Sequence, residues 1–303
     1  MSHNSDSGIL IIDKPADITS AKVVALLKKL TGAKKAGHAG TLDPFATGIL
    51  ICCLNEATKI SGFFLGGDKK YQARLRLGIS TDTQDFTGKI LSTCNEFNFS
   101  SEEIAAVFNK YTGDIEQIPP VFSALKYKGV PLYKLARKGR PIEKPARKVR
   151  INYLKILETN LPEIFFEVSC SGGTYIRTLC ADIGRDLGCG GHLKELRRIE
   201  SSGFHLSEAS TMDGLEKLAL SGNIGSRIIK MSDALKNIPG YIADDAFIKR
   251  ISCGNTITDK DISSDFLTGF GNFIKIVNKE NELIAVLKMI NCRFIYCCVI
   301  NRF

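Results

Sequence analysis

The hydrophobic and polar positions of this chain follow periods that predict both strands and helices. Residues 69–78, "KKYQARLRLG", alternate strictly. Tyr71, Ala73, Leu75 and Leu77 share one face and polar side chains share the other, so we expect a strand with one buried side. Apolar runs predict further strands at residues 8–15, 49–54, 148–154 and 163–171.

Three segments carry the period and the end signals of helices. Residues 19–32 begin at a Thr-Ser pair, carry apolar side chains three or four positions apart and stop at Gly32. Residues 101–113 begin with a serine followed by acids and end at a glycine. Residues 172–188 lead into a helix through two glycines. Its expected inward positions are Ile176, Leu179, Ile183 and Leu187.

The chain becomes basic and rich in proline over residues 118–154, which also carry three tyrosines. Two interpretations are open. The segment could follow a phosphate backbone while its aromatic rings meet bases, or it is a long solvated connection with a short helix at residues 132–139. After a boundary near residues 235–242, short apolar runs separated by glycines and polar turns predict a small β-rich domain. We expect an α+β chain with domains at residues 8–235 and 240–303.

Length and composition add limits to this picture. The 303 residues are 44% hydrophobic, which fits one large folded domain with a small companion. No apolar run approaches the ~18 residues of a membrane span, and the first residues, "MSHNSDSG", lack the regions of a secretory signal. We therefore expect a cytoplasmic protein without membrane contact. The net charge of +9 fits a polyanionic partner, although many soluble proteins are simply rich in lysine.

Cysteine and histidine usage argues against metal chemistry. None of the ten cysteines belongs to a paired C-x-x-C framework, and the chain has only four histidines. Cys52–Cys53 and Cys297–Cys298 are adjacent pairs inside apolar runs. Cys189 and His192 have no second pair to complete a tetrahedral zinc site. We expect buried, reduced thiols and no metal.

Two motifs suggest other chemistry but are incomplete. Residues 32–40, "GAKKAGHAG", have the glycine spacing of a phosphate-binding loop, yet His38 and Ala39 stand where its lysine and Ser/Thr are needed. Asp82 and Asp85 in "TDTQDFTG" could form a carboxylate pair for glycosidic acid–base chemistry. Acids separated by two residues in a polar turn usually serve as turn formers instead.

Asp43 is the lone acid of residues 37–48, "GHAGTLDPFATG". An aspartate before a proline commonly starts a turn. The glycines around it also leave room for a large ligand, so a nucleophilic carboxylate is the alternative. Arg177 lies in the first turn of a predicted helix, where the helix dipole disfavours a cation. It therefore needs a partner, which could be a buried carboxylate or a phosphate held at the glycine-rich turn.

Residues 37–50, "GHAGTLDPFATGIL", resemble the active-site loop of the TruB-type tRNA pseudouridine synthases. Five further stretches between about Gly8 and Phe204 resemble motifs of that family in the same order: "IIDKPADITS", "KKYQARLRLGISTDTQDFTG", "PPVFSALKYKGVPLYKLARKG", "SGGTYIRTLCADIGRDLG" and "HLKELRRIESSGF". The chain departs from the pattern at Ala39, where bacterial members often carry threonine. This change leaves the chemistry untouched.

The resemblance implies a catalytic domain on a mixed, mostly antiparallel sheet flanked by helices, and a C-terminal module similar to a PUA domain. It implies conversion of uridine to pseudouridine at position 55, in the T loop of tRNA. The N1–C1′ bond breaks, and the uracil turns and rejoins through C5, with neither cofactor nor metal. The expected partner is the T-arm stem-loop. The protein is expected to be a monomer without an obligatory protein partner.

The resemblance also implies roles for individual residues. Asp43 is the nucleophile, which attacks uracil C6 or ribose C1′. Tyr71 stacks on the flipped base and assists proton removal, and Arg177 pairs with Asp43. The remaining substrate-binding residues are His38, which fills the space left by the flipped nucleotide, and Tyr175 and Leu196, which line the uracil pocket. Two alternatives are a guide-RNA-dependent enzyme of the same superfamily and a tRNA-folding chaperone or RNA-binding module.

Overall fold

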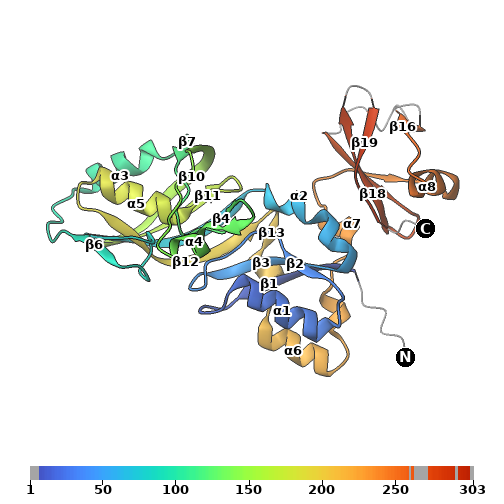
Figure 1. Ribbon diagram of the computed structural model, residues 1–303, viewed down its shortest axis with the longest axis horizontal. Helices are drawn as coiled ribbons and strands as arrows, with labels where there is room; N and C mark the ends of the chain where they lie inside the picture. The colour runs from blue at the N-terminus through green and yellow to red at the C-terminus, as the bar shows by residue number, and fades with distance from the viewer. Residues whose placement is uncertain (1–6, 259–260, 263–271, 291–292, 301–303) are drawn as a thin grey trace.

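Figure 1 shows the computed structural model, which describes residues 7–258, 261–262, 272–290 and 293–300. Eight strands of the larger sheet lie in the order β14-β1-β3-β12-β4-β11-β10-β7. In that order they span Ser210–Thr211, Gly8–Lys14, Thr47–Leu54, Gly191–Ser201, Lys69–Leu77, Glu163–Cys170, Arg147–Asn160 and Gly113–Gln117. Two more strands join this sheet: β2 (Ala36–His38) pairs with β3 and β13 (Phe204–His205) with β12. Among its described pairings only β1·β14 and β3·β12 are parallel. The expected mixed, mostly antiparallel sheet is confirmed.

Helices pack beside this sheet in two groups (Figure 1). α3 (Ser101–Lys110) and α5 (Ile176–Asp186) contact each other, and α5 also packs on β12 and β4. α1 (Ser20–Thr31) and α6 (Met212–Leu220) contact each other beside β1 and β3. Two short helices complete the unit, α2 (Ser61–Leu65) and α7 (Met231–Ala234). None of the described helices is both long and apolar enough to span a membrane.

The predicted alternation of β4 is confirmed, because its buried and partly exposed positions alternate along the whole strand. Its apolar face packs with Leu179 and Ile183 of α5 in one core. β3 is buried on both faces. Cys52 belongs to the apolar cluster beneath α1, and Cys53 belongs to a second cluster on the opposite face.

The prediction of buried thiols is wrong for part of the chain. Cys253 and Cys297 are exposed, while Cys94 and Cys298 are half-buried. Cys297 is exposed because alternate side chains of its strand face away from the core, so an apolar run there does not bury every residue. Cys292 lies outside the described residues.

The expected starts of α1 and α3 are present to within one residue, as is the expected end of α1, but α3 ends at Lys110, and the predicted stop, Gly113, instead begins β7. The Thr19 hydroxyl accepts a hydrogen bond from the Lys22 N–H (3.1 Å), and α1 ends at Gly32 in the left-handed conformation. α3 is capped by Ser100, one residue before the predicted serine. Ser100 and Glu103 bind each other's backbone N–H groups in a capping box.

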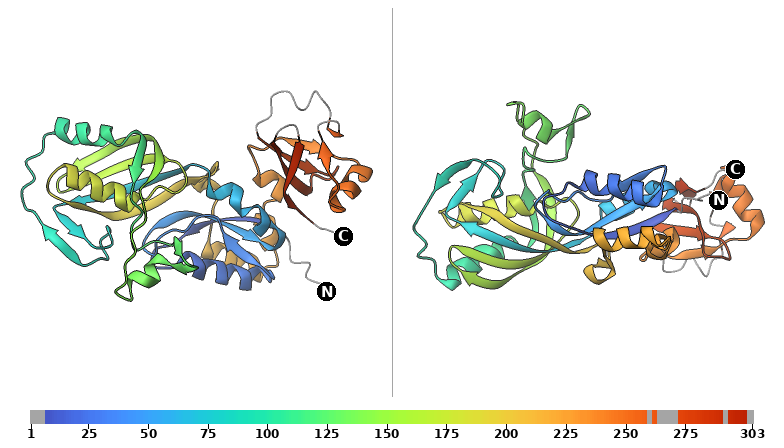
Figure 2. Two further views of the ribbon diagram at one scale, coloured as in Figure 1. Left: turned by 45° about the horizontal axis from the view of Figure 1, so that its top comes forward. Right: turned by 90° about the horizontal axis from the view of Figure 1, so that it is seen from below.

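Residues 118–146 form an arm that leaves the end of β7 and returns to the start of β10, its neighbour in the sheet. The right-hand view of Figure 2 shows the green part of this arm standing away from the body. It contains the strands β8 (Lys126–Tyr127) and β9 (Val130–Pro131) and the helix α4 (Leu132–Ala136). The predicted short helix is therefore present.

The C-terminal segment forms a separate five-stranded sheet, in the order β15-β17-β18-β19-β16. The predicted β-rich domain is confirmed. These strands span Gly240–Ile242, Phe273–Val277, Leu283–Ile290, Arg293–Val299 and Ile257–Thr258. α8 (Asp245–Ser252) packs beside β18 and was not predicted. Phe270, Gly271 and Cys292, which begin two of the predicted apolar runs, lie outside the described residues.

Side chains join the two sheets. Val277, Leu283 and Val286 share one apolar cluster with residues of β1 and β3. The rings of Phe63 and Phe273 meet edge to face, with centroids 5.4 Å apart.

Candidate active site

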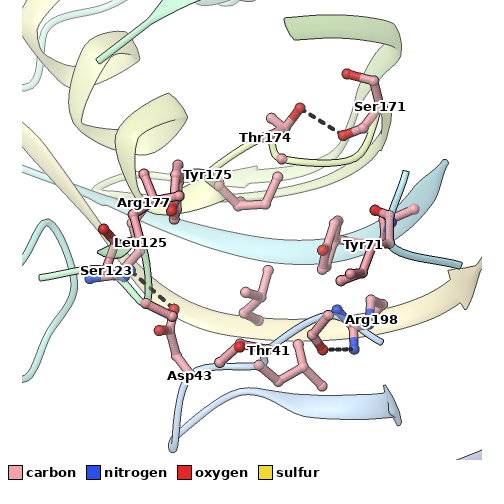
Figure 3. A pocket seen from close by; sticks show the side chains of 18 of the residues that line it. Thr41, Asp43, Tyr71, Ser123, Leu125, Ser171, Thr174, Tyr175, Arg177 and Arg198 are labelled. Atoms are coloured by element: carbon pink, nitrogen blue, oxygen red, sulfur yellow. Dashed lines mark hydrogen bonds and ion pairs between the residues drawn. The ribbon is translucent and has the colours of Figure 1, made fainter. Parts of the chain in front are cut away.

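The loop that carries Asp43 joins β2 to β3 and lies close to β12. Gly48, at its end, has a φ of +100°, and a Cβ there would lie 2.2 Å from the Arg198 carbonyl oxygen. Only glycine allows this approach. The Ala46 N–H donates to the Asp43 carbonyl oxygen (3.1 Å), so the backbone of Asp43 does start a turn. Its side chain is directed toward Arg177 (Figure 3).

The Asp43 carboxylate forms an ion pair with Arg177, whose Nε lies 3.0 Å from Asp43 Oδ2. The Arg177 side chain is only 5% exposed. Its Nη2 donates to the Phe122 carbonyl oxygen (2.9 Å) and its Nη1 to that of Thr83 (3.0 Å). The cation at the start of α5 therefore has a carboxylate as its partner in the folded chain. This contact outweighs the unfavourable helix dipole.

A second carboxylate, that of Asp85, reaches the same guanidinium. Asp85 Oδ2 lies 3.4 Å from Arg177 Nη1, and this side chain is buried. Asp85 Oδ1 accepts hydrogen bonds from the hydroxyl groups of Thr83 (2.8 Å) and Thr87 (2.5 Å). These bonds satisfy the buried carboxylate and fix its position. Two acids thus share one arginine, and only Asp43 of the two lines the neighbouring cavity.

A cavity of about 330 Å³ opens beside the Asp43 carboxylate. Five of the six expected site residues line it: Asp43, Tyr71, Tyr175, Arg177 and Leu196. Figure 3 shows Asp43 on its loop, Tyr71 on β4, and Tyr175 and Arg177 at the start of α5; Leu196 lies in β12. A carboxylate held by a guanidinium at the edge of such a cavity can serve as a nucleophile. In the described part of the chain, no group of three or more His, Cys, Asp or Glu residues could hold a metal ion.

The cavity changes the ionisation of its acidic groups. Burial raises the pKa of Asp43, and the Arg177 charge opposes this effect more strongly than Lys14 does. The carboxylate nevertheless keeps about a third of its side-chain surface open (31%). Burial also raises the pKa of the Tyr71 hydroxyl, while the neighbouring Arg198 charge partly offsets that rise. At neutral pH Tyr71 is therefore a phenol.

Three buried cations lie at the cavity or next to it: Lys69 and Arg198 line it, and Lys14 contacts the Asp43 loop. Arg198, 1% exposed, donates to the carbonyl oxygens of Ile49 (2.7 Å) and Gly40 (3.1 Å), which ties β12 to both ends of the Asp43 loop. Lys14 Nζ donates to three carbonyl oxygens, including that of Pro44 (2.9 Å). Burial lowers the pKa of Lys14 and of Lys69, each to about 8.

Comparison with known proteins identifies the family. Residues 28–176 match the "TruB family pseudouridylate synthase (N terminal domain)", and residues 177–231 match the "tRNA pseudouridylate synthase B C-terminal domain". The chain is 48% identical over 221 residues to tRNA pseudouridine synthase B of Francisella tularensis subsp. holarctica, covering 73% of each chain. It is 43% identical over 248 residues to the protein of that name from Syntrophotalea carbinolica, covering 82% of this chain and 81% of the other. The chain belongs to the TruB family of pseudouridine synthases.

Two solved structures are similar to this TruB-family enzyme over most of its length. The chain in a Cbf5-Nop10-Gar1 complex is 26% identical, with a TM-score of 0.76, covering 97% of this chain and 85% of that one. A chain of an H/ACA RNP bound to a substrate RNA containing 2′-deoxyuridine is also 26% identical, with a TM-score of 0.71, covering 93% of this chain and 78% of that one.

The structure separates His38 from the other expected site residues. His38 ends β2, and it is not among the residues that line the cavity beside Asp43. Its buried Nδ1 has no hydrogen-bond partner in the described part of the chain. Burial lowers the pKa of His38, and the Arg198 charge lowers it further, so the ring is neutral at physiological pH.

Two residues that support the site, Asp85 and Arg198, were not predicted as site residues from the sequence. Asp85 was interpreted as a turn former, although it also holds Arg177. Arg198 carried no signal of its own, because its partners lie about 150 residues away along the chain. The only available sign of its role was its position two residues after Leu196, which places both side chains on the same, buried face of the strand. Asp82 does serve the turn, since its carboxylate accepts from the Lys89 N–H (2.8 Å).

Proposed function

We propose that this enzyme isomerises uridine to pseudouridine at position 55 in the T loop of tRNA, with Asp43 as the nucleophile. The observation that carries the proposal is the Asp43–Arg177 ion pair at the edge of a cavity large enough for a nucleoside. The relatives named tRNA pseudouridine synthase B support tRNA as the substrate.

The chemistry begins with the ionised Asp43 carboxylate. It attacks uracil C6 or ribose C1′, and the N1–C1′ bond breaks with its electron pair remaining on the uracil. The base turns, a C5–C1′ bond forms, the bond to Asp43 breaks with its electron pair returning to the carboxylate, the proton leaves C5, and N1 gains a proton. The product is an isomer of the substrate, so no oxidant, reductant or leaving group is required. Arg177 keeps Asp43 ionised and directed at the reacting carbon.

Tyr71 stacks on the flipped base and takes part in moving the C5 proton. Its buried ring, on the cavity face of β4, supports the stacking role. Burial keeps the Tyr71 hydroxyl protonated at neutral pH, and the neighbouring Arg198 charge only partly offsets the rise of its pKa, so Tyr71 assists proton removal as a phenol. Tyr175 and Leu196 bound the uracil from other sides of the cavity. His38, outside the cavity, fills the stack that the flipped nucleotide leaves.

The arm and the C-terminal sheet extend the RNA-binding surface. The arm carries seven lysines and arginines between residues 126 and 144, and it stands away from the body, where a phosphate backbone can follow it (Figure 2). We propose residues 8–235 as the catalytic domain and residues 240–303 as a PUA-like RNA-binding domain. The free thiols of the described cysteines suit a reducing cytoplasm, and we propose a monomer without an obligatory protein partner.

A guide-RNA-dependent enzyme is the competing candidate, because the two similar solved structures are a Cbf5-Nop10-Gar1 complex and an H/ACA RNP. The higher identity to the relatives named tRNA pseudouridine synthase B favours the first proposal. The test is pseudouridine mapping of a tRNA transcript after incubation with the purified chain alone. Pseudouridine at position 55, and its loss with Asp43→Asn, is the expected result. No pseudouridine, or pseudouridine at another position, would overturn the proposal.

A further inference from the structure

Two buried side chains each bind both backbone polar groups of a residue at the active site. The Ser20 hydroxyl accepts from the Leu42 N–H (2.9 Å) and donates to the Leu42 carbonyl oxygen (3.1 Å). The Gln117 amide does the same to Tyr175. Its Oε1 accepts from the Tyr175 N–H (2.7 Å) and its Nε2 donates to the carbonyl oxygen (3.0 Å). We call these two contacts the Ser20 clamp and the Gln117 clamp.

The two clamps act on opposite sides of the ion pair. Leu42 directly precedes Asp43, and Tyr175 lies two residues before Arg177. Ser20 is the first residue of α1 and Gln117 the last residue of β7, so each clamp fixes a loop segment to a regular element. Both clamping side chains are at least 98% buried. Each of these buried polar side chains finds its hydrogen-bond partners in the backbone of the clamped residue.

The clamps supply hydrogen bonds at backbone positions that no strand pairing serves, while Arg198 and Lys14 hold the Asp43 loop at Gly40 and Pro44. Tyr175 is the N-cap residue of α5, and its own side chain makes no capping hydrogen bond. Gln117 supplies an acceptor for that backbone N–H, which otherwise has no intrahelical partner. On the other side, the residues between Ala39 and Ala46 lie outside β2 and β3, and the Ser20 hydroxyl takes both polar groups of Leu42.

We infer that Ser20 and Gln117 are positioning residues that set the geometry of the Asp43–Arg177 pair. This inference rests on the proposed function for its activity readout. Neither side chain touches the reacting atoms. Each holds the backbone next to one member of the pair, so its loss shifts that member relative to the other. A misplacement of about 1 Å can cost a reaction about 100-fold.

The Gln117 clamp also joins the active site to the arm. Gln117 ends β7, and the arm begins at the next residue. Five residues into the arm, the Phe122 carbonyl oxygen accepts from Arg177 Nη2. The root of the arm thus holds α5 at two points, Tyr175 and Arg177. The arm, which we propose binds RNA, therefore also fixes Arg177, the partner of the nucleophile.

The test uses the full chain with Gln117→Met, Ser20→Ala and the combination of both. Gln117→Met is nearly isosteric and removes both hydrogen bonds of its clamp. Ser232→Ala is the matched control. Ser232 is fully buried, and its hydroxyl donates to the Asn281 carbonyl oxygen (2.5 Å). It is not among the residues that line the cavity. The measurements are single-turnover rate on tRNA, Kd for tRNA, thermal stability, and backbone hydrogen exchange of residues 40–46 and 173–178.

Each clamp variant should lower the single-turnover rate by about tenfold or more while the Kd stays within about threefold, because the phosphate contacts remain. Exchange should accelerate at residues 40–46 in Ser20→Ala and at residues 173–178 in Gln117→Met. The double variant should lose less than the product of the two single losses, since both act on one pair. Ser232→Ala should lose thermal stability but keep the wild-type rate.

Three results would overturn the inference. The first is faster local exchange with an unchanged rate, because the clamps would then be structural only. The second is a rate loss in Ser232→Ala equal to that of the clamp variants. The third is losses that multiply fully in the double variant. If the wild-type chain itself forms no pseudouridine, the proposed function fails. Separately, unchanged hydrogen exchange in the clamp variants would show that Ser20 and Gln117 do not fix these two backbone segments.

Discussion

Replacing Arg177 by lysine keeps the positive charge but removes the planar guanidinium, and we expect a large loss of rate. The guanidinium now contacts four groups at once: Asp43, Asp85 and the carbonyl oxygens of Thr83 and Phe122. An ammonium group on a flexible stem cannot occupy the positions of Nε, Nη1 and Nη2 together. If it stays near Asp85 and Thr83, the Asp43 carboxylate loses its fixed direction.

The magnitude follows from two separate effects. Misdirecting Asp43 by about 1 Å costs about 100-fold in rate, which corresponds to about 2.7 kcal/mol of activation free energy. The carbonyl oxygen that loses its donor costs about 1–3 kcal/mol of folding stability. The first effect acts on kcat, because the direction of the nucleophile matters in the reactive complex. The second lowers Tm and leaves the surface that binds RNA intact.

The assay is steady-state and single-turnover kinetics of Arg177→Lys on tRNA, well below its measured Tm. We expect kcat to fall about 100-fold while KM changes by less than about threefold. An unchanged kcat with a raised KM would refute the reasoning. Arg177 would then bind a phosphate of the substrate, and Asp43 would need a different partner for its ionisation.

Four further predictions concern the same site and surface. Asp43→Asn should abolish isomerisation with nearly unchanged tRNA affinity, and turnover within about tenfold of wild type would contradict its role as nucleophile. The rate should fall with decreasing pH as Asp43 becomes protonated. Because burial raises the pKa of Asp43, the midpoint of this acid limb in a kcat–pH profile should lie above the ordinary value of about 3.9. A midpoint at or below that value would show that the ion pair with Arg177 outweighs burial. Asp85→Asn should also lower kcat, because Arg177 then loses one of the two acids that hold it, and a raised KM alone would place Asp85 in RNA binding. Finally, the Kd for a T-arm stem-loop should rise steeply with salt, and log Kd against log[salt] should have a slope of about +0.7 to +0.9 per phosphate contact. A flat plot would mean that the basic arm does not bind the phosphates of the RNA.

Local sequence patterns predicted many of the strands and helices, because these elements depend on interactions between residues that are near in the sequence. The alternation of β4 and the caps of α1 and α3 depend on neighbouring residues, and all are present. α8 was missed although Asp244 caps it and Phe247 and Ile251 face inward at helical spacing. The glycines and polar turns around it suggested strands instead.

The site was predicted mainly through resemblance, and its supporting residues were not. Asp43 and Arg177 lie in motifs, but nothing local shows that Asp85 is buried, because its turn is polar except for Phe86, which is itself exposed. Arg198 and the two clamping residues act on partners between 22 and 158 positions away. Such contacts arise only when distant strands and helices pack, so a pattern within one segment cannot reveal them.

The apolar cluster shared by the two sheets also has a consequence for how the chain unfolds. Val277, Leu283 and Val286 bury their side chains among residues of β1 and β3, and Lys275 donates to the carbonyl oxygens of Ser232 (2.8 Å) and Leu235 (3.0 Å). Removing the C-terminal sheet would leave part of that cluster facing water and promote aggregation of the remainder. The two sheets should therefore melt in one cooperative transition. The contribution of the C-terminal sheet to RNA binding is best measured by surface substitutions rather than by truncation.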